Sequence, residues 1–298
     1  MNSPKTTSQT SNARIPVLTS LRAEDWEIIG LYFFLMAGSL WHVLGVLQSA
    51  MSVLSGPVVV MIALWIAYRY DQVLRRERSD SAHRAPLAMP QDHDGTQHNG
   101  HLTAAARLET SPTQARSGQA LSGIARLHQS SITVRFHSWN LAVGVLCFAL
   151  EYVGVKTGMI FGKYQYMDVW VPALNGVPLA ISFAWLGMLL SSFAVVQRAL
   201  ASVQSPWLRA FCVALCMTVF DMFMEPVSVK LHYWHWLEAT GNSFIVAPLQ
   251  NYLAWFGNSF LLAYCAVRLG LFQTQMPRVA WHGYWAQLLY FSIIALAA

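Results

Sequence analysis

Two carboxylic acids, Asp221 and Glu225, lie four residues apart at the end of the apolar run Phe211 to Met224. At this spacing both side chains face the same side of a helix. A carboxylate near lipid is costly unless it is paired, protonated or hydrated, so its presence there indicates a function. Desolvation favours the neutral acid, and in a close pair one charge opposes the other. The pair therefore suits acid–base chemistry, with one group protonated and one ionised.

The rest of the chain must place this pair in a membrane. It has 298 residues, of which 55% are hydrophobic and only 11% charged, against about 25% charged in ordinary soluble domains. Seven apolar stretches approach the roughly 20 residues that cross a bilayer. We expect an all-α, polytopic membrane bundle with these spans: Trp26–Gln48, Val53–Tyr70, Ile132–Tyr152, Val177–Val196, Trp207–Met224, Leu249–Leu269 and Trp281–Ala297.

The positive charges indicate the orientation of these spans. With a cytoplasmic N-terminus, all 15 arginines fall on or near the cytoplasmic side, whereas the opposite face holds only Lys156, Lys163 and Lys230. This is the positive-inside pattern, so the net charge of +5 reports topology rather than a nucleic-acid partner. Residues 1–20 have no apolar core of a signal peptide, and the first span is expected to direct insertion.

The chain divides into four parts on composition. Residues 71–130 are rich in Ser, Gln, His, Arg and Ala and have almost no aromatics, a composition typical of a disordered segment. We expect a polar tail over 1–25, a two-helix membrane unit over 26–70, a disordered cytoplasmic linker over 71–130 and a five-helix membrane domain over 131–298.

Several polar residues should meet near the outer lipid boundary. The third span ends at Glu151 and the fifth at Asp221 and Glu225, both running outward, and His42 lies in the outer part of the first span. Pro226 is expected to end or kink the fifth span. These four side chains are therefore predicted at one depth.

The connections after these spans are rich in aromatic residues. Tyr164 and Tyr166 follow Glu151, and Trp234 and Trp236 follow Glu225. They fit either an interfacial aromatic belt or a substrate pocket. The glycines at 154, 158 and 162 fit either a helix face that allows close packing or turns.

Two breaker segments precede spans and carry an amide, Asn175 before the fourth and Asn251 at the sixth. They are either helix starts or re-entrant turns lining a cavity, where the two amides could hold a water. His232 and His235 could share a helix face beside Glu225 and Glu238, but we favour hydrogen bonding over metal binding and predict no metal site.

The motifs between about residues 135 and 270 resemble the integral-membrane carotenoid biosynthesis protein family. They are Glu151-x-x-Gly154-x-x-Thr157-Gly158-x-x-Phe161-Gly162-x-Tyr164-x-Tyr166, then Pro172-x-Leu174-x-Gly176-Val177-Pro178-Leu179, then Asp221-x-x-x-Glu225-Pro226, then Tyr233-Trp234-x-Trp236. The family includes carotenoid 1,2-hydratases, among them the bisanhydrobacterioruberin hydratases. The resemblance implies a hydro-lyase of the bacterial or archaeal cell membrane whose partners are membrane lipid and an acyclic carotenoid.

Hydration of an isopropylidene end needs a proton, a stabilised tertiary cation and water, and no redox or organic cofactor. The protonated member of Asp221 and Glu225 would be the general acid, and its ionised partner or Glu151 would orient water. The faces of the four aromatics would stabilise the cation. The substrate-binding set is then Tyr164, Tyr166, Trp234, Trp236, Asn175, Asn251 and His42.

Two other functions remain open on the sequence. The same acid chemistry without water capture gives a carotenoid end-group cyclase or isomerase. Intramembrane carboxyls equally suit a proton-coupled transporter, although transporters often show repeat halves and midplane sites, whereas these acids lie at one face.

Overall fold

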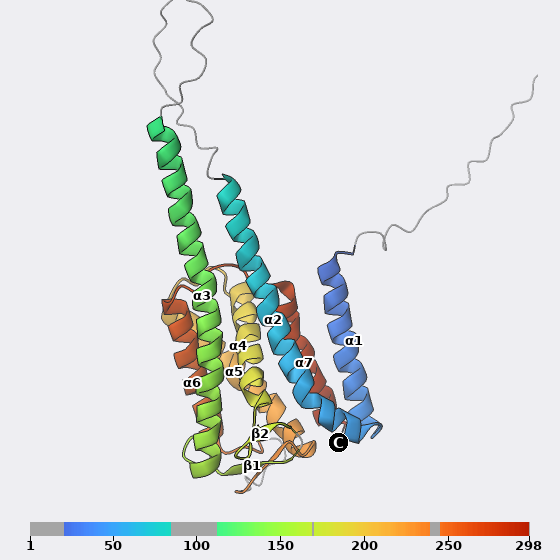
Figure 1. The fold of residues 1–298 in the computed structure, drawn as a ribbon. Coiled ribbons are helices and arrows are strands. Elements are labelled where there is room, and N and C mark those ends of the chain that lie inside the picture. The colour runs from blue at the N-terminus through green and yellow to red at the C-terminus, as the bar shows by residue number, and fades with distance from the viewer. Residues whose placement is uncertain (1–20, 85–111, 169, 239–244, 298) are drawn as a thin grey trace, which may run out of the picture.

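The computed structural model describes residues 21–84, 112–168, 170–238 and 245–297. Within these ranges the chain forms helices that run side by side as one bundle, with small strands at one end (Figure 1). The helices are α1 Ala23–Val43, α2 Gln48–Arg84, α3 Pro112–Thr157, α4 Ala180–Ala199, α5 Pro206–Lys230, α6 Leu249–Arg268 and α7 Arg278–Leu296. Each expected span coincides with a helix, so the all-α bundle is confirmed.

The bundle has the character of a membrane protein. Helices α1 and α4, the Gln48–Asp80 part of α2, the Ile132–Thr157 part of α3, and α5 are long and apolar enough to cross a membrane. Large apolar side chains such as Phe33 and Leu141 point outward, with exposed fractions of 76% and 71%. Outward apolar side chains are stable only against lipid or another apolar surface.

Helix α4 forms the centre of the bundle. From Trp185 to Val196 all its residues are buried, and it packs against α2, α3, α5 and α7. It meets α2 closely at Gly187, where an added Cβ would lie 3.1 Å from that of Ala63. Small residues allow such an approach between membrane helices. The two N-terminal helices thus belong to the same bundle, with α1 packed mainly on α7.

The predicted linker is shorter than expected. Helix α2 continues through residues 71–84, and α3 already begins at Pro112, so the prediction of disorder is wrong for 71–84 and 112–130; residues 85–111 lie outside the described part. The segment after Tyr70 contains four arginines between residues 71 and 84, together with Gln72, Leu74 and Glu77, and these residue types favour helix. Asp71 also bonds Arg75 at 2.6 Å and His137 of α3 at 3.0 Å, which supports the extension of α2.

Two small antiparallel sheets close one end of the bundle. Strand β1, Tyr164–Tyr166, pairs with β4, Trp234–Trp236, so that Tyr164 faces Trp236 and Tyr166 faces Trp234. Strand β2, Ala173–Leu174, pairs with β3, Val177–Pro178. The aromatic-rich connections, for which we left a belt and a substrate pocket both open, therefore contain ordered strands. We call this end of the molecule the strand end.

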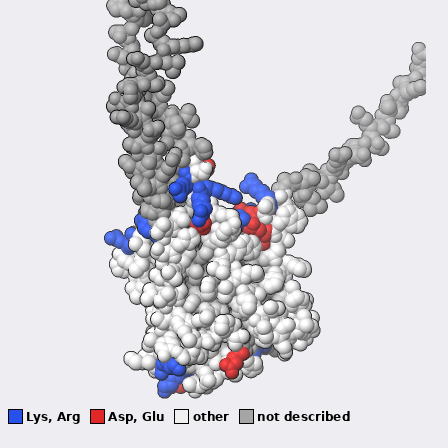
Figure 2. Space-filling model, in the orientation of Figure 1, with Lys and Arg blue, Asp and Glu red and all other residues white. Residues whose placement is uncertain are grey.

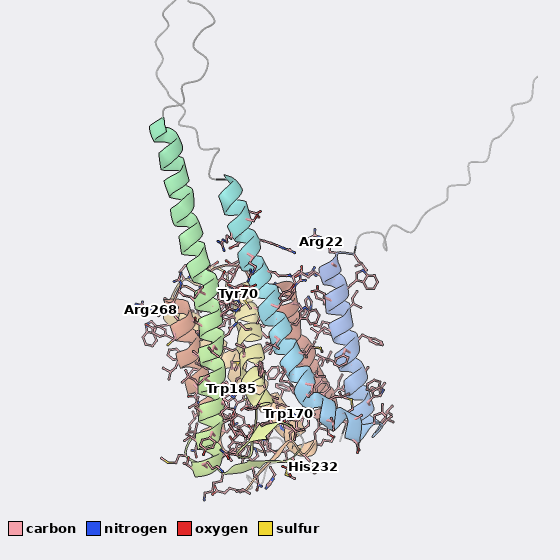
Figure 3. All side chains as sticks on the ribbon, viewed as in Figure 1. Arg22, Tyr70, Trp170, Trp185, His232 and Arg268 are labelled. Atoms are coloured by element: carbon pink, nitrogen blue, oxygen red, sulfur yellow. The ribbon has the colours of Figure 1, made fainter. Side chains whose placement is uncertain are left out.

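Charged residues gather at the two ends and leave the middle bare (Figure 2). Arg22 and Arg268 lie towards the end where α1 begins, and Trp170 and His232 lie towards the strand end (Figure 3). Ion pairs tie the helices at the first end, with Arg69 2.6 Å from Glu27 and Arg278 2.5 Å from Asp25. Which end faces the cytoplasm stays a prediction.

Candidate active site

Glu151 is buried near the end of α3 and accepts three hydrogen bonds. The hydroxyls of Tyr164 and Tyr166 donate to its Oε2 at 2.5 and 2.8 Å, and Trp185 Nε1 donates to its Oε1 at 2.9 Å. The two tyrosines alternate along β1, so both point to the same face. Three donors on one buried carboxyl stabilise its ionised form.

The two tyrosines remain donors. Burial, followed by the charge of Glu151, raises the pKa of both Tyr164 and Tyr166, because each effect disfavours a phenolate. Their hydroxyls therefore keep their protons, and they can orient Glu151 without exchanging protons with it.

Asp221 and Glu225 form a buried pair on α5. Trp234 Nε1 and Trp236 Nε1 donate to Glu225 Oε2 at 3.0 and 2.9 Å. Asn251 Nδ2 donates to Asp221 Oδ2 at 2.7 Å and reaches Glu225 Oε1 at 3.4 Å.

Asn251 thus lies beside both carboxyls, which are buried one helical turn apart on α5, while Asp221 Oδ1 has no hydrogen-bond partner in the described residues. Two buried carboxylates this close oppose each other's charge, which favours one proton held within the pair.

The β1–β4 pairing brings the two carboxyl centres together. Tyr164 and Trp236 have ring centroids 5.2 Å apart, and those of Tyr166 and Trp234 are 5.9 Å apart. One strand donates to Glu151 and its partner strand donates to Glu225. The sheet thus holds Glu151, with its three donors, beside the Asp221–Glu225 pair.

A small cavity lies between these groups. It has about 20 Å³ of space for water and is lined by Glu151, Glu225, Asn251 and aromatic rings, whereas Asp221 is not part of its wall. A space of this size holds one water when polar partners surround it. Glu225 therefore faces the cavity with Asp221 behind it.

Three aromatic residues of this site were not among the predicted site residues: Phe161, which stands in the family motif, Trp185 and Trp255. Trp185 and Trp255 stack with centroids 3.9 Å apart, and Phe161 and Trp255 line the cavity. Trp185 stands in mid-span, where its N–H needs a partner, and Trp255 lies four residues after Asn251. Those two signals were available in the sequence.

Glycines in the connection after α3 make room for this packing. Gly154 lies within α3, where an added Cβ would come within 2.7 Å of the Phe161 ring. Gly158 and Gly162 have φ of +68° and +102° and form turns after the helix. Of the two interpretations of this spacing, close packing thus holds for Gly154 and turns hold for the others.

Asn175 is not part of the site. It is exposed in the two-residue turn between β2 and β3, where Asn175 and Gly176 have φ of +53° and +84°. Asn-Gly is the preferred pair for this hairpin turn, so the prediction that Asn175 holds a water in a re-entrant segment is wrong. Asn251, in contrast, is buried in the first turn of α6 and bonds the acid pair, as a helix start.

Pro226 does not end α5, which continues to Lys230. A proline removes a single intrahelical bond, and the buried Val227 and Ser228 hold the next turn in the bundle. His232 and His235 follow the helix but do not gather with Asp or Glu into a possible metal site in the part of the chain that is described.

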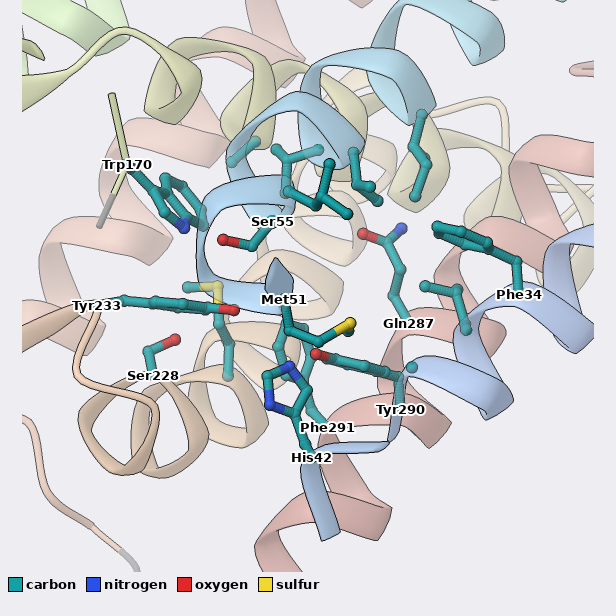
Figure 4. Close-up of a pocket in the computed structure, with 18 of the residues that line it drawn as sticks. Phe34, His42, Met51, Ser55, Trp170, Ser228, Tyr233, Gln287, Tyr290 and Phe291 are labelled. Atoms are coloured by element: carbon teal, nitrogen blue, oxygen red, sulfur yellow. The ribbon is translucent and has the colours of Figure 1, made fainter. Parts of the chain in front are cut away.

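His42 lies in a different cavity from the carboxyls. It sits at the end of α1, and its ring meets that of Tyr290 edge-on at 6.1 Å. Both line a larger space of about 140 Å³ between α1, α2, α4, α5 and α7 (Figure 4). His42 lies towards the strand end, as do the three acids, which agrees with the predicted common depth. It does not contact them. Met224 lines both cavities.

The fold and site together define a helical membrane protein with three buried carboxyls, Glu151, Asp221 and Glu225, at its strand end. Residues 121–298 match the family model for carotenoid biosynthesis proteins. The chain belongs to this family, and its carotenoid biosynthesis role agrees with the motif resemblance. Helices α1 and α2 precede the matched region.

One characterised relative shares part of the sequence. Over 117 residues the chain is 24% identical to the bisanhydrobacterioruberin hydratase of Haloarcula japonica, and the alignment covers 39% of each protein. The chain thus spans well under half of that relative's length. No solved structure matches the chain significantly.

Proposed function

We propose that this protein is a cofactor-independent hydratase that adds water to the terminal C=C bond of an acyclic carotenoid end group. Membership of the carotenoid biosynthesis family and the partial similarity to a hydratase support this class of reaction. The observation that carries it is the water-sized cavity between Glu151 and Glu225, which suits addition of water.

The first step is protonation of the alkene. The proton shared by Asp221 and Glu225 passes from Glu225, which faces the cavity, to the less substituted carbon of the terminal double bond. The C=C π electrons form the new C–H bond and leave a tertiary carbocation on the neighbouring carbon. Asp221 and Asn251 keep the acid pair in position. Such general acid catalysis contributes about 10²–10⁴-fold.

The second step is capture of water. Glu151, oriented by Tyr164, Tyr166 and Trp185, accepts a proton from the water as its oxygen bonds to the cation. The product is a tertiary alcohol, and return of that proton to the Asp221–Glu225 pair completes the cycle. One water is consumed and no electron is gained or lost.

The aromatic walls stabilise the cation between these steps. Trp234, Trp236 and Trp255 line the cavity together with Tyr164. A cation over a desolvated aromatic face gains about 0.5–2 kcal/mol. The indole N–H bonds to Glu225 also fix the rings of Trp234 and Trp236.

Expression in a lycopene-producing host, with pigment analysis by mass, tests the reaction. Hydration adds the mass of one water for each modified end. A cyclase or isomerase would change the pigment without changing its mass, and a proton-coupled transporter would leave the pigment unaltered. Either of those results at confirmed protein level would refute the hydratase proposal.

A further inference from the structure

An apolar chamber lies beside the carboxyl site. Its space of about 140 Å³ lies between five helices, and most of its wall is apolar. Figure 4 shows Phe34, Met51, Trp170 and Phe291 around it. We use "apolar chamber" for this cavity.

Several polar side chains line the apolar chamber. Ser55 and Gln287 bond backbone carbonyls of their own helices, whereas His42 Nε2 and Trp170 Nε1 have no hydrogen-bond partner among the described residues. The Tyr290 ring meets the His42 ring. The remaining wall is formed by residues such as Leu35, Val59 and Met188. A hydrocarbon can fill the chamber against this apolar wall without breaking the hydrogen bonds of Ser55 and Gln287.

The chamber and the carboxyl site share helix α5. Phe220, Met224 and Ser228 recur every four residues and line the chamber, so they form one face of the helix. Asp221 and Glu225 are each one position further along and form the adjacent face. Met224, which lines both cavities, separates the hydrocarbon space from the acid.

The N-terminal helices supply about half of the chamber wall. Eleven of its 21 lining residues belong to α1 or α2, for example Phe34, Gly38 and Met51. Both helices precede the region that matches the family model, which begins at residue 121. Without them the chamber would have no wall on this side.

We propose that the apolar chamber binds the hydrocarbon chain of an acyclic polyene next to its reacting end, and that α1 and α2 are substrate-binding elements. The identity of the ligand rests on the proposed function. The end group reaches the acid pair past Met224, whose flexible unbranched side chain can change rotamer to admit it. The size of the space left by Gly38 and its neighbours limits which chains fit.

A pair of substitutions on α1 tests the chamber. In Gly38→Leu the new side chain enters the space, because an added Cβ already meets Met51 at 3.4 Å and Tyr290 at 3.6 Å. Gly30→Leu is the matched control: it makes the same change on the same helix at an exposed position with nothing within 4 Å of an added Cβ. The measurement is lycopene binding to the full-length protein in detergent, followed by quenching of tryptophan fluorescence.

We expect Gly38→Leu to weaken lycopene binding by about tenfold or more, since overfilling a packed space is costly, and Gly30→Leu to bind as wild type. Val59→Phe, in the chamber wall on α2, and its control Val53→Phe, 62% exposed on the same helix, repeat the comparison. This second pair decides the outcome if Gly38→Leu does not fold.

Lycopene binding by both chamber variants at wild-type affinity would overturn the proposal and leave the hydratase proposal standing. Failure of the acid mechanism can be distinguished from failure of the chamber proposal. Glu225→Gln should abolish turnover yet keep lycopene binding; full turnover in that variant would refute the acid mechanism while the chamber remained supported.

Discussion

Tyr164 and Trp236 face each other across the β1–β4 pair with ring centroids 5.2 Å apart, yet they bond different carboxyl groups. Tyr164 donates to Glu151 at 2.5 Å and Trp236 donates to Glu225 at 2.9 Å. A two-stranded sheet therefore sets the relative positions of the proposed base and acid.

The acid pair should be essential and act as a unit. Asp221→Asn and Glu225→Gln should each lower turnover by about 10²-fold or more, because neither amide can share the carboxyl proton. The double variant should lose far less than the product of the two, since residues that act together are non-additive. Hydroxylated carotenoid per unit of membrane protein is the measurement.

Glu238→Gln is the control for the acid pair. Glu238 is exposed and bonds only Lys163 among the described residues, at 3.0 Å, so its turnover should stay within about twofold of wild type. Near-normal product from both Asp221→Asn and Glu225→Gln would remove the pair from the mechanism.

Glu151 should depend on its tyrosines. Tyr166→Phe removes one of its donors, and we expect turnover to fall by about tenfold, in line with about 1.5–3 kcal/mol for a hydrogen bond to a charged group. Tyr152→Phe changes a partly exposed ring on the same helix as Glu151 and should have no effect. Equal turnover in the two variants would show that Glu151 needs no such orientation.

The two asparagines should behave oppositely. Asn251→Ala removes the donor that spans Asp221 and Glu225, so turnover should drop by about tenfold or more. Asn175→Gly should leave turnover unchanged, because glycine readily adopts the positive φ of this turn. Comparison of the initial rates of the two variants tests which asparagine belongs to the candidate active site. Loss of activity in Asn175→Gly would place the β2–β3 turn in the site.

The strand end should face away from the cytoplasm. Because the arginines collect at the opposite end, we expect a cysteine placed at residues 231–238 to react with an external, membrane-impermeant thiol reagent. Cysteines at residues 71–84 should be protected in the same cells. The background protein lacks the four native cysteines, and external labelling of the 71–84 positions would reverse the topology.

The sequence predicted the helices and the acids better than it predicted their surroundings. Hydrophobic runs are local, so they predicted all seven helices of the described residues, five of which are long and apolar enough to cross a membrane. Glu151, Asp221 and Glu225 stood out as charges at the ends of such runs. The bond from Trp185 to Glu151 joins distant parts of the chain, and so does the β1–β4 pairing. No local pattern reports either contact.

Two local signals were read incorrectly. The Asn175-Gly176 pair predicts a hairpin turn, and the helix-forming residues after Tyr70 predict a continued α2. In the first case the position of the segment before an apolar run suggested a helix start or a re-entrant turn. In the second case the overall polar composition suggested disorder.

A sheet as small as β1–β4 is too short to persist alone, and its four aromatic side chains end on two buried carboxyls. If the strands separated, Glu151 and Glu225 would lose hydrogen-bond donors together. Each would then be left buried with unpaired oxygens, which is destabilising. The two carboxyls proposed to act in catalysis therefore also stabilise the strand end of the bundle. A protein adapted to a new carotenoid end group would have to keep these hydrogen bonds. We therefore expect its substitutions to fall on the helices around the apolar chamber.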